Sequence, residues 1–425
     1  MEAFTFSAAS MTTLQILSVL FATAALFGWI SVRWLRLPIT IGTMLLTVLV
    51  SLALAGAGGL APGMHVWAVG LSHQIDFGSI ILHGMLPLLL FAGAFLLDLE
   101  QLAREKLAVS LLSIVGTLLS VFLVAGLMFL LFGASLPWMQ CLIFGALISP
   151  TDPIAVLEML RRTGVPGHIQ AQLAGESLFN DGIGAVLFLA MLDAAGGHAP
   201  SPWSIAGMLL LKAGGGILIG ILAAWVAGQM MRRVDSYQVD ILFTVALALG
   251  GYALADALSL SAPLEAVVAG IALRHFKNQS TEQVDYDRVD RFWEVIDEIQ
   301  NSVLFVLLGF ETMAVAINPS ALLAGVAAVF SVNAVRLGAV ALLLALVHLV
   351  HHQHQSSLFV MTWGGLRGGL SIALALSVPA ALGGAWMLNA TFLVVVFSIV
   401  VQGGSMDWLL RRWKSAGERP VRTQP

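Results

Sequence analysis

Long apolar runs, separated by short polar connections, recur along the whole chain. A helix needs about 20 apolar residues to cross the hydrocarbon core of a membrane. By this measure the sequence predicts thirteen spans, which begin near Leu14, Pro38, Ile80, Leu107, Pro137, Gln172, Ser204, Val239, Pro263, Val295, Ala321, Leu358 and Leu388. We therefore expect an all-α membrane protein with one transmembrane domain over residues 1–412 and a short cytoplasmic tail over residues 413–425.

Basic residues lie in alternate connections between these spans. The even-numbered connections contain no Lys or Arg, whereas the odd-numbered ones contain Arg33, Arg36, Arg104, Lys106, Arg161, Arg162, Arg232, Arg233, Arg274, Lys277, Arg288 and Arg291. Because connections rich in Lys and Arg stay in the cytoplasm, this alternation predicts an N-terminus outside and a C-terminus inside the cell. The first residues, MEAFTFSAAS, are acidic where a secretory signal is basic, so we expect an uncleaved first span.

Composition narrows the class of protein further. The chain is 59% hydrophobic and 10% charged, with a mean hydropathy of +0.93, whereas about a quarter of the residues of a soluble domain are charged. The net charge of −4 gives no reason to expect a nucleic acid partner. The single cysteine, Cys141, cannot form a disulfide framework or a thiolate metal cluster.

Two of the predicted spans contain residues that interrupt a helix. The fifth contains SPTDP, in which Asp152 stands between Pro150 and Pro153, and prolines remove backbone hydrogen bonds. The twelfth contains WGGLRGGLS around Arg367, where glycines weaken the helix. The two motifs lie seven spans apart, as expected for two six-span inverted repeats joined by one linking span. Paired interrupted helices in inverted repeats are typical of secondary transporters, with the substrate site at the interruption.

Two aspartates lie deep in neighbouring spans. At about 1.5 Å per residue, Asp152 lies about 14 Å before the turn at Arg161, and Asp181 lies at a similar depth after that turn. Carboxylates inside the membrane are costly and usually mark a path for ions or protons. On the second helix Ser177 shares a face with Asp181, whereas Glu176 points about 140° away and needs a positive partner.

The combined motifs resemble one family. TDP together with GESLFND, followed by FWEVIDEIQNSVLFVLLG and TWGGLRGGLS, is similar to the bacterial NhaP-type sodium/proton antiporters, relatives of the animal exchangers. The resemblance implies exchange of a monovalent cation, Na⁺ or Li⁺, for protons across the inner membrane by a homodimer without a cofactor. It also implies that Asp152 and Asp181 bind the cation or protons, with Thr151 and Ser177 as further oxygen ligands.

The resemblance assigns supporting residues as well. It implies that Asn180 helps to hold the interrupted region, that Glu176 pairs with Arg336 of NAVRLGAV, and that Arg367 is the motif arginine. Members with Asn-Asp rather than Asp-Asp are usually electroneutral, and this chain reads Asn180-Asp181.

The chain departs from the family pattern in the third span. Many relatives have an acidic residue in a phrase like LLFEAGL, whereas this chain has Ala92 there. The nearby Asp98 lies toward the cytoplasmic end and is interpreted as interfacial. Pairing or snorkelling explains Lys212 better than a direct function does, and Glu265 receives no role.

The chemistry of the site suggests how exchange is coupled. Two carboxylates close together at low dielectric disfavour simultaneous ionisation, so a cation and a proton compete for the same negative charge. If only a loaded site moves between inward-facing and outward-facing states, exchange needs no covalent chemistry.

Other functions are compatible with parts of this pattern. Potassium/proton exchange would use the same residues. An intramembrane aspartyl protease also needs two membrane aspartates, but its YD and GxGD phrases differ from PTDP and FNDG. A channel would show rings of carbonyls or charges in repeated segments.

Overall fold

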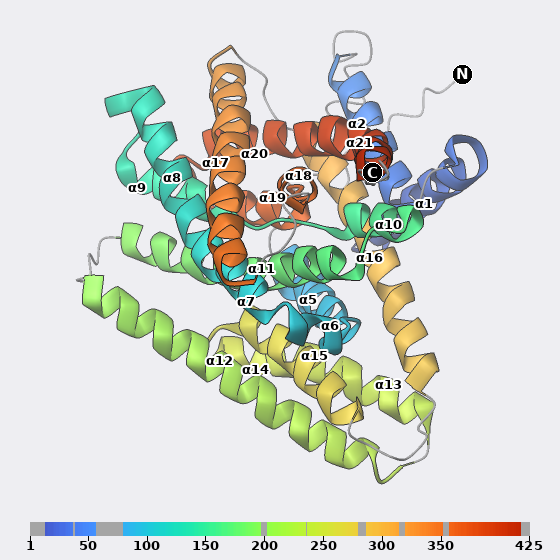
Figure 1. Cartoon of the computed structure of the whole chain (residues 1–425). Helices are drawn as coiled ribbons and strands as arrows, with labels where there is room; N and C mark the ends of the chain where they lie inside the picture. Colours follow the sequence, from blue (N-terminus) through green and yellow to red (C-terminus); the bar gives the residue numbers. More distant parts are fainter. Residues whose placement is uncertain are drawn as a thin grey trace, which may run out of the picture.

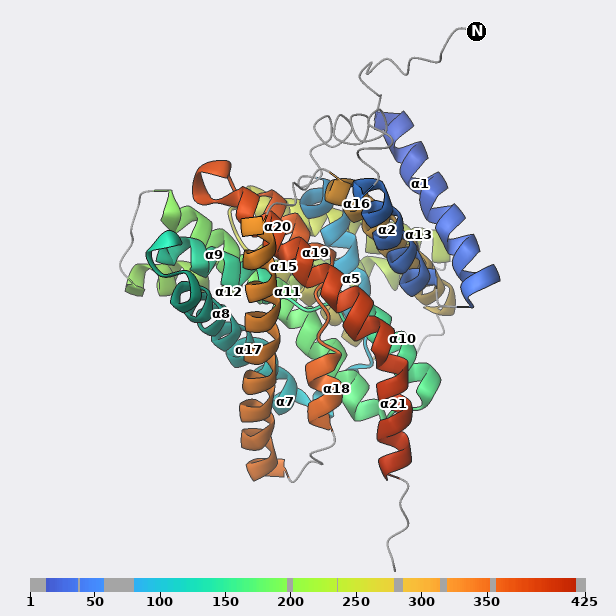
Figure 2. The same ribbon diagram turned by 90° about the horizontal axis from the view of Figure 1, so that it is seen from above.

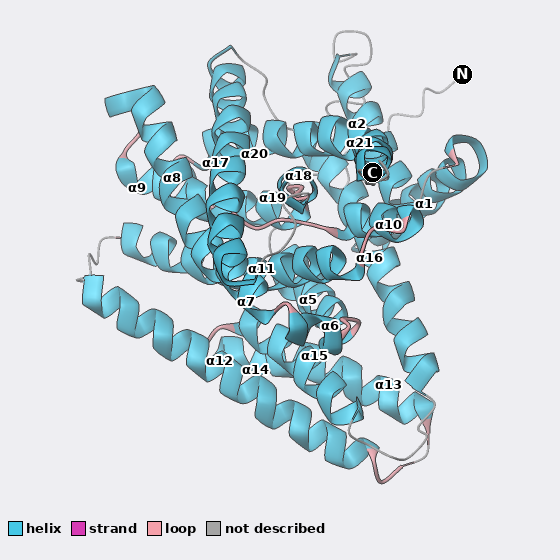
Figure 3. Ribbon diagram, viewed as in Figure 1, coloured by secondary structure: helices cyan, strands magenta, loops and turns pink. Residues whose placement is uncertain are grey.

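The protein is a bundle of helices in the computed structural model. The model describes residues 13–36, 39–56, 80–196, 202–234, 236–278, 286–313, 319–351 and 357–417. Every regular element within these ranges is a helix (Figure 3), which confirms the all-α class. Residues 1–12, on which the prediction of an uncleaved first span depends, and residues 418–425 of the predicted tail lie outside the described residues.

The described elements follow one another along the chain in two parts. The first part contains α1 (Thr13–Ile30), η1 (Ser31–Leu35), α2 (Ile39–Gly56), η2 (Ile80–Met85), α5 (Leu86–Phe95), α6 (Leu99–Arg104), α7 (Lys106–Ser110), η3 (Leu111–Val115), α8 (Gly116–Phe132), η4 (Gly133–Ser135), α9 (Trp138–Ile148), α10 (Ile154–Thr163) and α11 (Gly167–Ala195). The second part contains α12 (Pro202–Met231), α13 (Tyr237–Ala246), η5 (Leu247–Gly251), α14 (Tyr252–Ala257), α15 (Ala262–Asn278), α16 (Tyr286–Met313), α17 (Pro319–His351), α18 (Ser357–Trp363), α19 (Gly369–Leu376), η6 (Ala380–Leu382), α20 (Gly384–Phe397), η7 (Ser398–Gly403) and α21 (Gly404–Gly417).

Many of these helices are long and apolar enough to cross a membrane. Within the described ranges, seven helical runs meet this criterion: Leu14–Leu35, Lys106–Phe132, Gly167–Ala195, Leu210–Met231, Tyr237–Ala257, Ala321–His348 and Gly384–Arg412. Ile80–Phe95 and Trp138–Ile148 are shorter apolar helices. The protein therefore crosses the membrane several times, and the count of thirteen spans stays a prediction.

Both predicted interruptions are present at the centre of the molecule (Figures 1 and 2). The fifth span is divided into α9 and α10, and residues 149–153 between them have no helical structure. Pro150 has no N–H group to continue α9, and α10 begins directly after Pro153. The twelfth span is divided into α18 and α19 by residues 364–368, the glycine-rich stretch.

The other helices surround this centre. α11 packs against α9, and α17 packs against α18, α20 and α8. α12 packs along α15, which in turn packs along α5, while α2 packs along α16 (Figure 1). α1 lies at the edge of the molecule in both ribbon views. The end of α17, the start of α18 and the end of α21 project to the same side (Figure 2).

Glycines allow α12 and α15 to approach closely. A Cβ atom on Gly216 would lie 2.4 Å from the carbonyl oxygen of Ser261, and one on Gly220 would lie 2.8 Å from that of Glu265. Two small residues four apart let helix backbones touch within a membrane. Gly216 and Gly220 of KAGGGILIG therefore serve helix packing.

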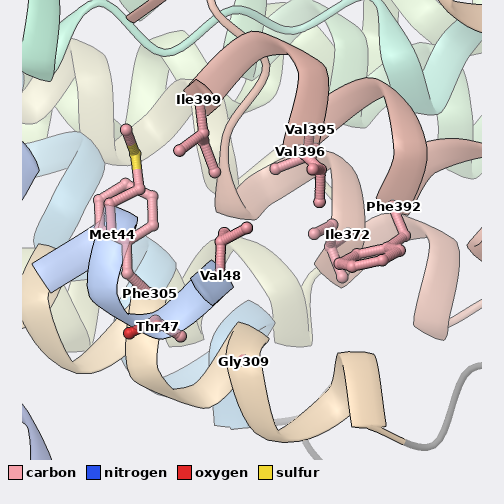
Figure 4. A pocket seen from close by; sticks show the side chains of 10 residues that line it. All are labelled: Met44, Thr47, Val48, Phe305, Gly309, Ile372, Phe392, Val395, Val396 and Ile399. Atoms are coloured by element: carbon pink, nitrogen blue, oxygen red, sulfur yellow. The ribbon is translucent and has the colours of Figure 1, made fainter. Parts of the chain in front are cut away.

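An apolar pocket separates α2 and α16 from α19, α20 and η7 (Figure 4). It is lined by Met44, Thr47, Val48, Phe305, Gly309, Ile372, Phe392, Val395, Val396 and Ile399. None of the predicted site residues lines it. The pocket has no charged lining residue, so it does not resemble a site for a hydrated ion.

Candidate functional site

The two interrupted stretches touch each other through their backbones. The N–H of Asp152 donates to the carbonyl oxygen of Leu366 at 2.8 Å, forming an isolated antiparallel bridge. Arg367, buried beside this bridge, donates from Nη1 to the carbonyl oxygens of Ser149 (2.5 Å) and Pro150 (2.9 Å). These carbonyls follow the C-terminal end of α9, where a helix carries partial negative charge. One arginine therefore satisfies backbone groups that the prolines release.

Side chains of α11 hold the other face of the extended segment. The N–H of Thr151 donates to Asn180 Oδ1 at 3.2 Å, and Asn180 Nδ2 donates to Thr151 Oγ1 at 2.7 Å. Ser177 Oγ donates to the carbonyl oxygen of Thr151, and its Oγ lies 3.5 Å from Thr151 Oγ1. All three side chains are buried. In a buried site these bonds compensate for the helical hydrogen bonds that the segment lacks.

The two aspartates lie within electrostatic range of each other. Asp181 follows Ser177 by one helical turn of α11, and its carboxylate repels that of Asp152 and attracts Arg367. Both aspartates keep partial solvent exposure, in contrast to the buried residues around them. The side chain of Asp152 lies against Gly368, on which a Cβ atom would stand 2.4 Å from Asp152 Oδ2. The arrangement places two partly accessible carboxylates beside one buried guanidinium group.

Glu176 faces away from the aspartates, as helical phase predicts, and pairs with Arg336. Both carboxylate oxygens accept from the guanidinium group, with Nη2 lying 2.9 Å from Oε2, and Nη2 also donates to the carbonyl oxygen of Met361 at 2.8 Å. Both side chains are buried. A Cβ atom on Gly365 would lie 2.7 Å from Arg336 Nε, so this glycine leaves room for the guanidinium group. The pair connects α11, α17 and the end of α18.

All eight predicted site residues therefore gather around the crossing of the interrupted spans: Thr151, Asp152, Glu176, Ser177, Asn180, Asp181, Arg336 and Arg367. The sequence reasoning missed Gly365 and Gly368, whose lack of a side chain makes room for Arg336 and Asp152. The paired glycines on both sides of Arg367 were the available signal, and they were interpreted only as helix-weakening residues.

The remaining predictions concern residues outside this centre. Asp98 is exposed and caps α6, accepting from the N–H groups of Glu100 and Gln101, which fits an interfacial position. Lys212 lies 3.5 Å from Asp193, which confirms pairing. Ala92 is fully buried in α5.

Comparisons with known proteins agree with this architecture. The family model described as "Sodium/hydrogen exchanger, transmembrane" matches residues 21–412. The chain is 38% identical over 409 residues to the Na(+)/H(+) antiporter NhaP of Pseudomonas aeruginosa, covering 94% of this chain and 96% of that protein. It is 32% identical over 346 residues to the Na(+)/H(+) antiporter NhaH of Halobacillus dabanensis, covering 79% and 83%.

A solved structure has the same fold. The sodium proton antiporter MjNhaP1 of Methanocaldococcus jannaschii superposes with a TM-score of 0.73 at 20% sequence identity, covering 94% of this chain and 98% of that chain. The relatives are named as transporters of ions rather than as enzymes or cofactor-dependent proteins. The chain belongs to the sodium/hydrogen exchanger family.

Proposed function

We propose that this protein exchanges a monovalent cation, Na⁺ in the first place, for protons, and that Asp152 and Asp181 form the shared binding site. Family membership supports the exchange activity. The observation that carries the site is the electrostatic proximity of the two aspartates, one on each side of the crossing of the interrupted spans. A site at interrupted helices is the usual arrangement in secondary transporters.

The charges of the site support one-for-one exchange. The crossing of the interrupted spans brings together three carboxylates (Asp152, Glu176 and Asp181) and two guanidinium groups (Arg336 and Arg367), which leave one negative charge when all are ionised. The Glu176–Arg336 pair neutralises itself, and Arg367 offsets one aspartate. Either one Na⁺ or one proton then makes the site neutral, and a neutral site is far cheaper to move through low dielectric than a charged one.

This charge balance gives a mechanism for coupling. The empty site keeps an uncompensated charge and resists the change between inward-facing and outward-facing states, whereas the loaded site does not. The cation and the proton therefore occupy the site in turn, and each movement of the site across the membrane carries one of the two. The result is alternating access with one cation exchanged for one proton.

Oxygen atoms around the aspartates provide the chemistry for a hard cation. The hydroxyls of Thr151 and Ser177 and the carbonyl of Thr151 lie at the crossing and are proposed as further ligands. Na⁺ is preferred because the relatives' names specify it. K⁺ and Li⁺ are tested with the same assay.

The test compares two aspartates on α11 in proteoliposomes containing a pH-sensitive dye. Asp181→Asn removes the proposed binding charge and should abolish cation-driven proton movement, reducing it at least about a hundredfold. Asp193→Asn is the matched control, because Asp193 lies on the same helix with 62% of its side chain exposed. We expect the control to transport normally. Normal exchange in Asp181→Asn would refute the site, and a rate that follows the membrane potential would refute electroneutrality.

The setting of the protein in the cell forms part of the same proposal. We place it in the inner membrane with its N-terminus outside and its C-terminal tail inside, as a homodimer with a single transmembrane antiporter domain over residues 1–412 and a tail over residues 413–425. Alternation of the basic residues supports the orientation. Light scattering on the purified protein would test the dimer.

A further inference from the structure

Glu265 is a buried carboxyl that the transport site does not use. It lies on α15, its side chain has no solvent exposure, and neither carboxylate oxygen has a hydrogen-bond partner among the residues that the structure describes. Buried polar atoms are paired in the great majority of cases, so each exception needs an explanation.

The space around Glu265 is shaped to fit its carboxyl group. A Cβ atom on Gly251 would lie 2.1 Å from Glu265 Oε1 and 2.8 Å from its Cδ, so the carboxyl occupies the volume of the missing side chain. Gly251 ends the π-helical turn η5, and π-turns are frequent at functional sites. On the α12 side, the backbone of Gly220 touches that of Glu265. The carboxyl is therefore enclosed where η5, α12 and α15 meet.

The charged groups on the surrounding helices are engaged elsewhere or lie at the surface. On α12, Lys212 pairs with Asp193. On α14, Asp256 is exposed, and the hydroxyl of Tyr252 donates to the carbonyl oxygen of Leu82 at 3.0 Å. α5 contains no ionisable side chain.

The helices α11 and α6 also pack against α15. On α11, Asp181 interacts with Asp152 and Arg367. Glu100 of α6 pairs with Arg104 at the surface. The next charged residue of α15, Arg274, is bound to Asp290. An unpaired carboxylate in such surroundings is so unfavourable that the group keeps a proton instead.

We propose that Glu265 is a proton-binding site separate from Asp152 and Asp181, whose neutral carboxyl group allows η5, α12 and α15 to remain packed together. Loss of the proton places a charge in this junction and loosens it. The junction adjoins the transport helix, because Leu264 contacts Gly182, the residue after Asp181. The junction around Glu265 therefore packs against the helix that carries Asp181.

Infrared difference spectroscopy of the purified full-length protein tests the bound proton. We expect a carbonyl stretching band of a protonated carboxylic acid at neutral pH that is absent from Glu265→Gln and retained in Asp256→Asn, the exposed control on α14. Identical acid bands in the wild type and Glu265→Gln would show that Glu265 is ionised and would overturn the proposal.

Thermal unfolding in detergent tests the packing role. Glu265→Gln should match the wild type at acidic pH, where both side chains are neutral, and should become the more stable protein as the pH rises. Gly251→Ala should lower the melting temperature of the wild type but not of Glu265→Ala, in which the competing carboxyl is removed. Parallel pH profiles, or an equal effect of Gly251→Ala in both backgrounds, would contradict the proposal. These readouts do not depend on transport, so they stand apart from the test of the transport site.

Discussion

Glu176 and Arg336 illustrate how single residues fix the centre of this protein. The side chain of Glu176 is 1% exposed and that of Arg336 is 8% exposed, and each neutralises the other. Such a pair adds little net stability, because desolvation offsets the attraction, but removing one partner leaves a buried charge. The pair therefore constrains α11 against α17.

We predict that Glu176→Gln destabilises the protein by about 3–5 kcal/mol, because Arg336 then lies buried without a counter-charge. The measurement is thermal unfolding of the purified protein in detergent. The matched control is Glu100→Gln, which removes an exposed pair with Arg104 and should cost less than about 1 kcal/mol. Equal losses of stability in the two variants would show that burial does not determine how much an ion pair of this protein contributes.

The sequence predicts some of these residue contacts and not others. Helical phase separates Glu176 from Ser177 and Asp181 correctly, because one helix fixes their directions. The bonds between Thr151 and the side chains of Ser177 and Asn180 could not be derived in this way, since they join α11 to the non-helical segment before α10, 26 and 29 positions away. Only the relative placement of two helices determines them.

At the scale of elements, the crossing of the interrupted spans depends on the absence of side chains. The backbone of Gly368 has φ −120° and ψ −156°, which any residue can adopt. Its importance lies instead in its lack of a side chain, because a Cβ atom on Gly368 would lie 2.4 Å from Asp152 Oδ2. Asp152 is thus held on one side by Gly368, directly before α19, and on the other by its own backbone bond to Leu366.

We predict that Gly368→Ala displaces the Asp152 carboxylate and lowers exchange by about a hundredfold, since a displacement of about 1 Å at a functional group has effects of this size. Exchange in proteoliposomes is the measurement. Gly338→Ala on α17 is the control, because nothing lies within 4 Å of its Cβ position. If both variants transport equally well, the contact with Gly368 does not position Asp152.

The interruptions themselves could be predicted, but their contact could not. Pro150 and Pro153 locate the first break by chemistry that is local to the chain. The pairing of Asp152 with Leu366 joins positions more than 200 residues apart, and no local pattern encodes it. The shared depth of the two breaks was the only indication in the sequence.

At the scale of the whole molecule, the directions of the helix ends can be compared with the predicted topology, which stays a prediction. The end of α17, the start of α18 and the end of α21 project to one side, as expected if the eleventh connection and the tail share a compartment (Figure 2). The number of spans is harder to predict, because some helices of the bundle, such as α9 and α15, are shorter than a typical membrane-spanning helix.

We predict that the third connection faces the cytoplasm and the fourth faces the outside. The only native cysteine, Cys141, is buried, so introduced cysteines can be labelled selectively. Ser135→Cys in η4 should react with a membrane-impermeant maleimide in intact cells. Arg104→Cys in α6, also exposed, should react only after permeabilisation. The reverse pattern would invert the proposed topology.

The π-helical turns have a consequence for comparing this chain with its relatives. Each of η3, η5 and η7 lies between two α-helical segments, where it widens the hydrogen-bonded ring and thereby accommodates one residue more than an α-helix of the same length. A homologue without one of these turns would differ by a single-residue deletion that leaves both flanking helix faces in register. Isolated one-residue gaps at these three places would therefore record the gain or loss of a turn, with the surrounding interfaces preserved.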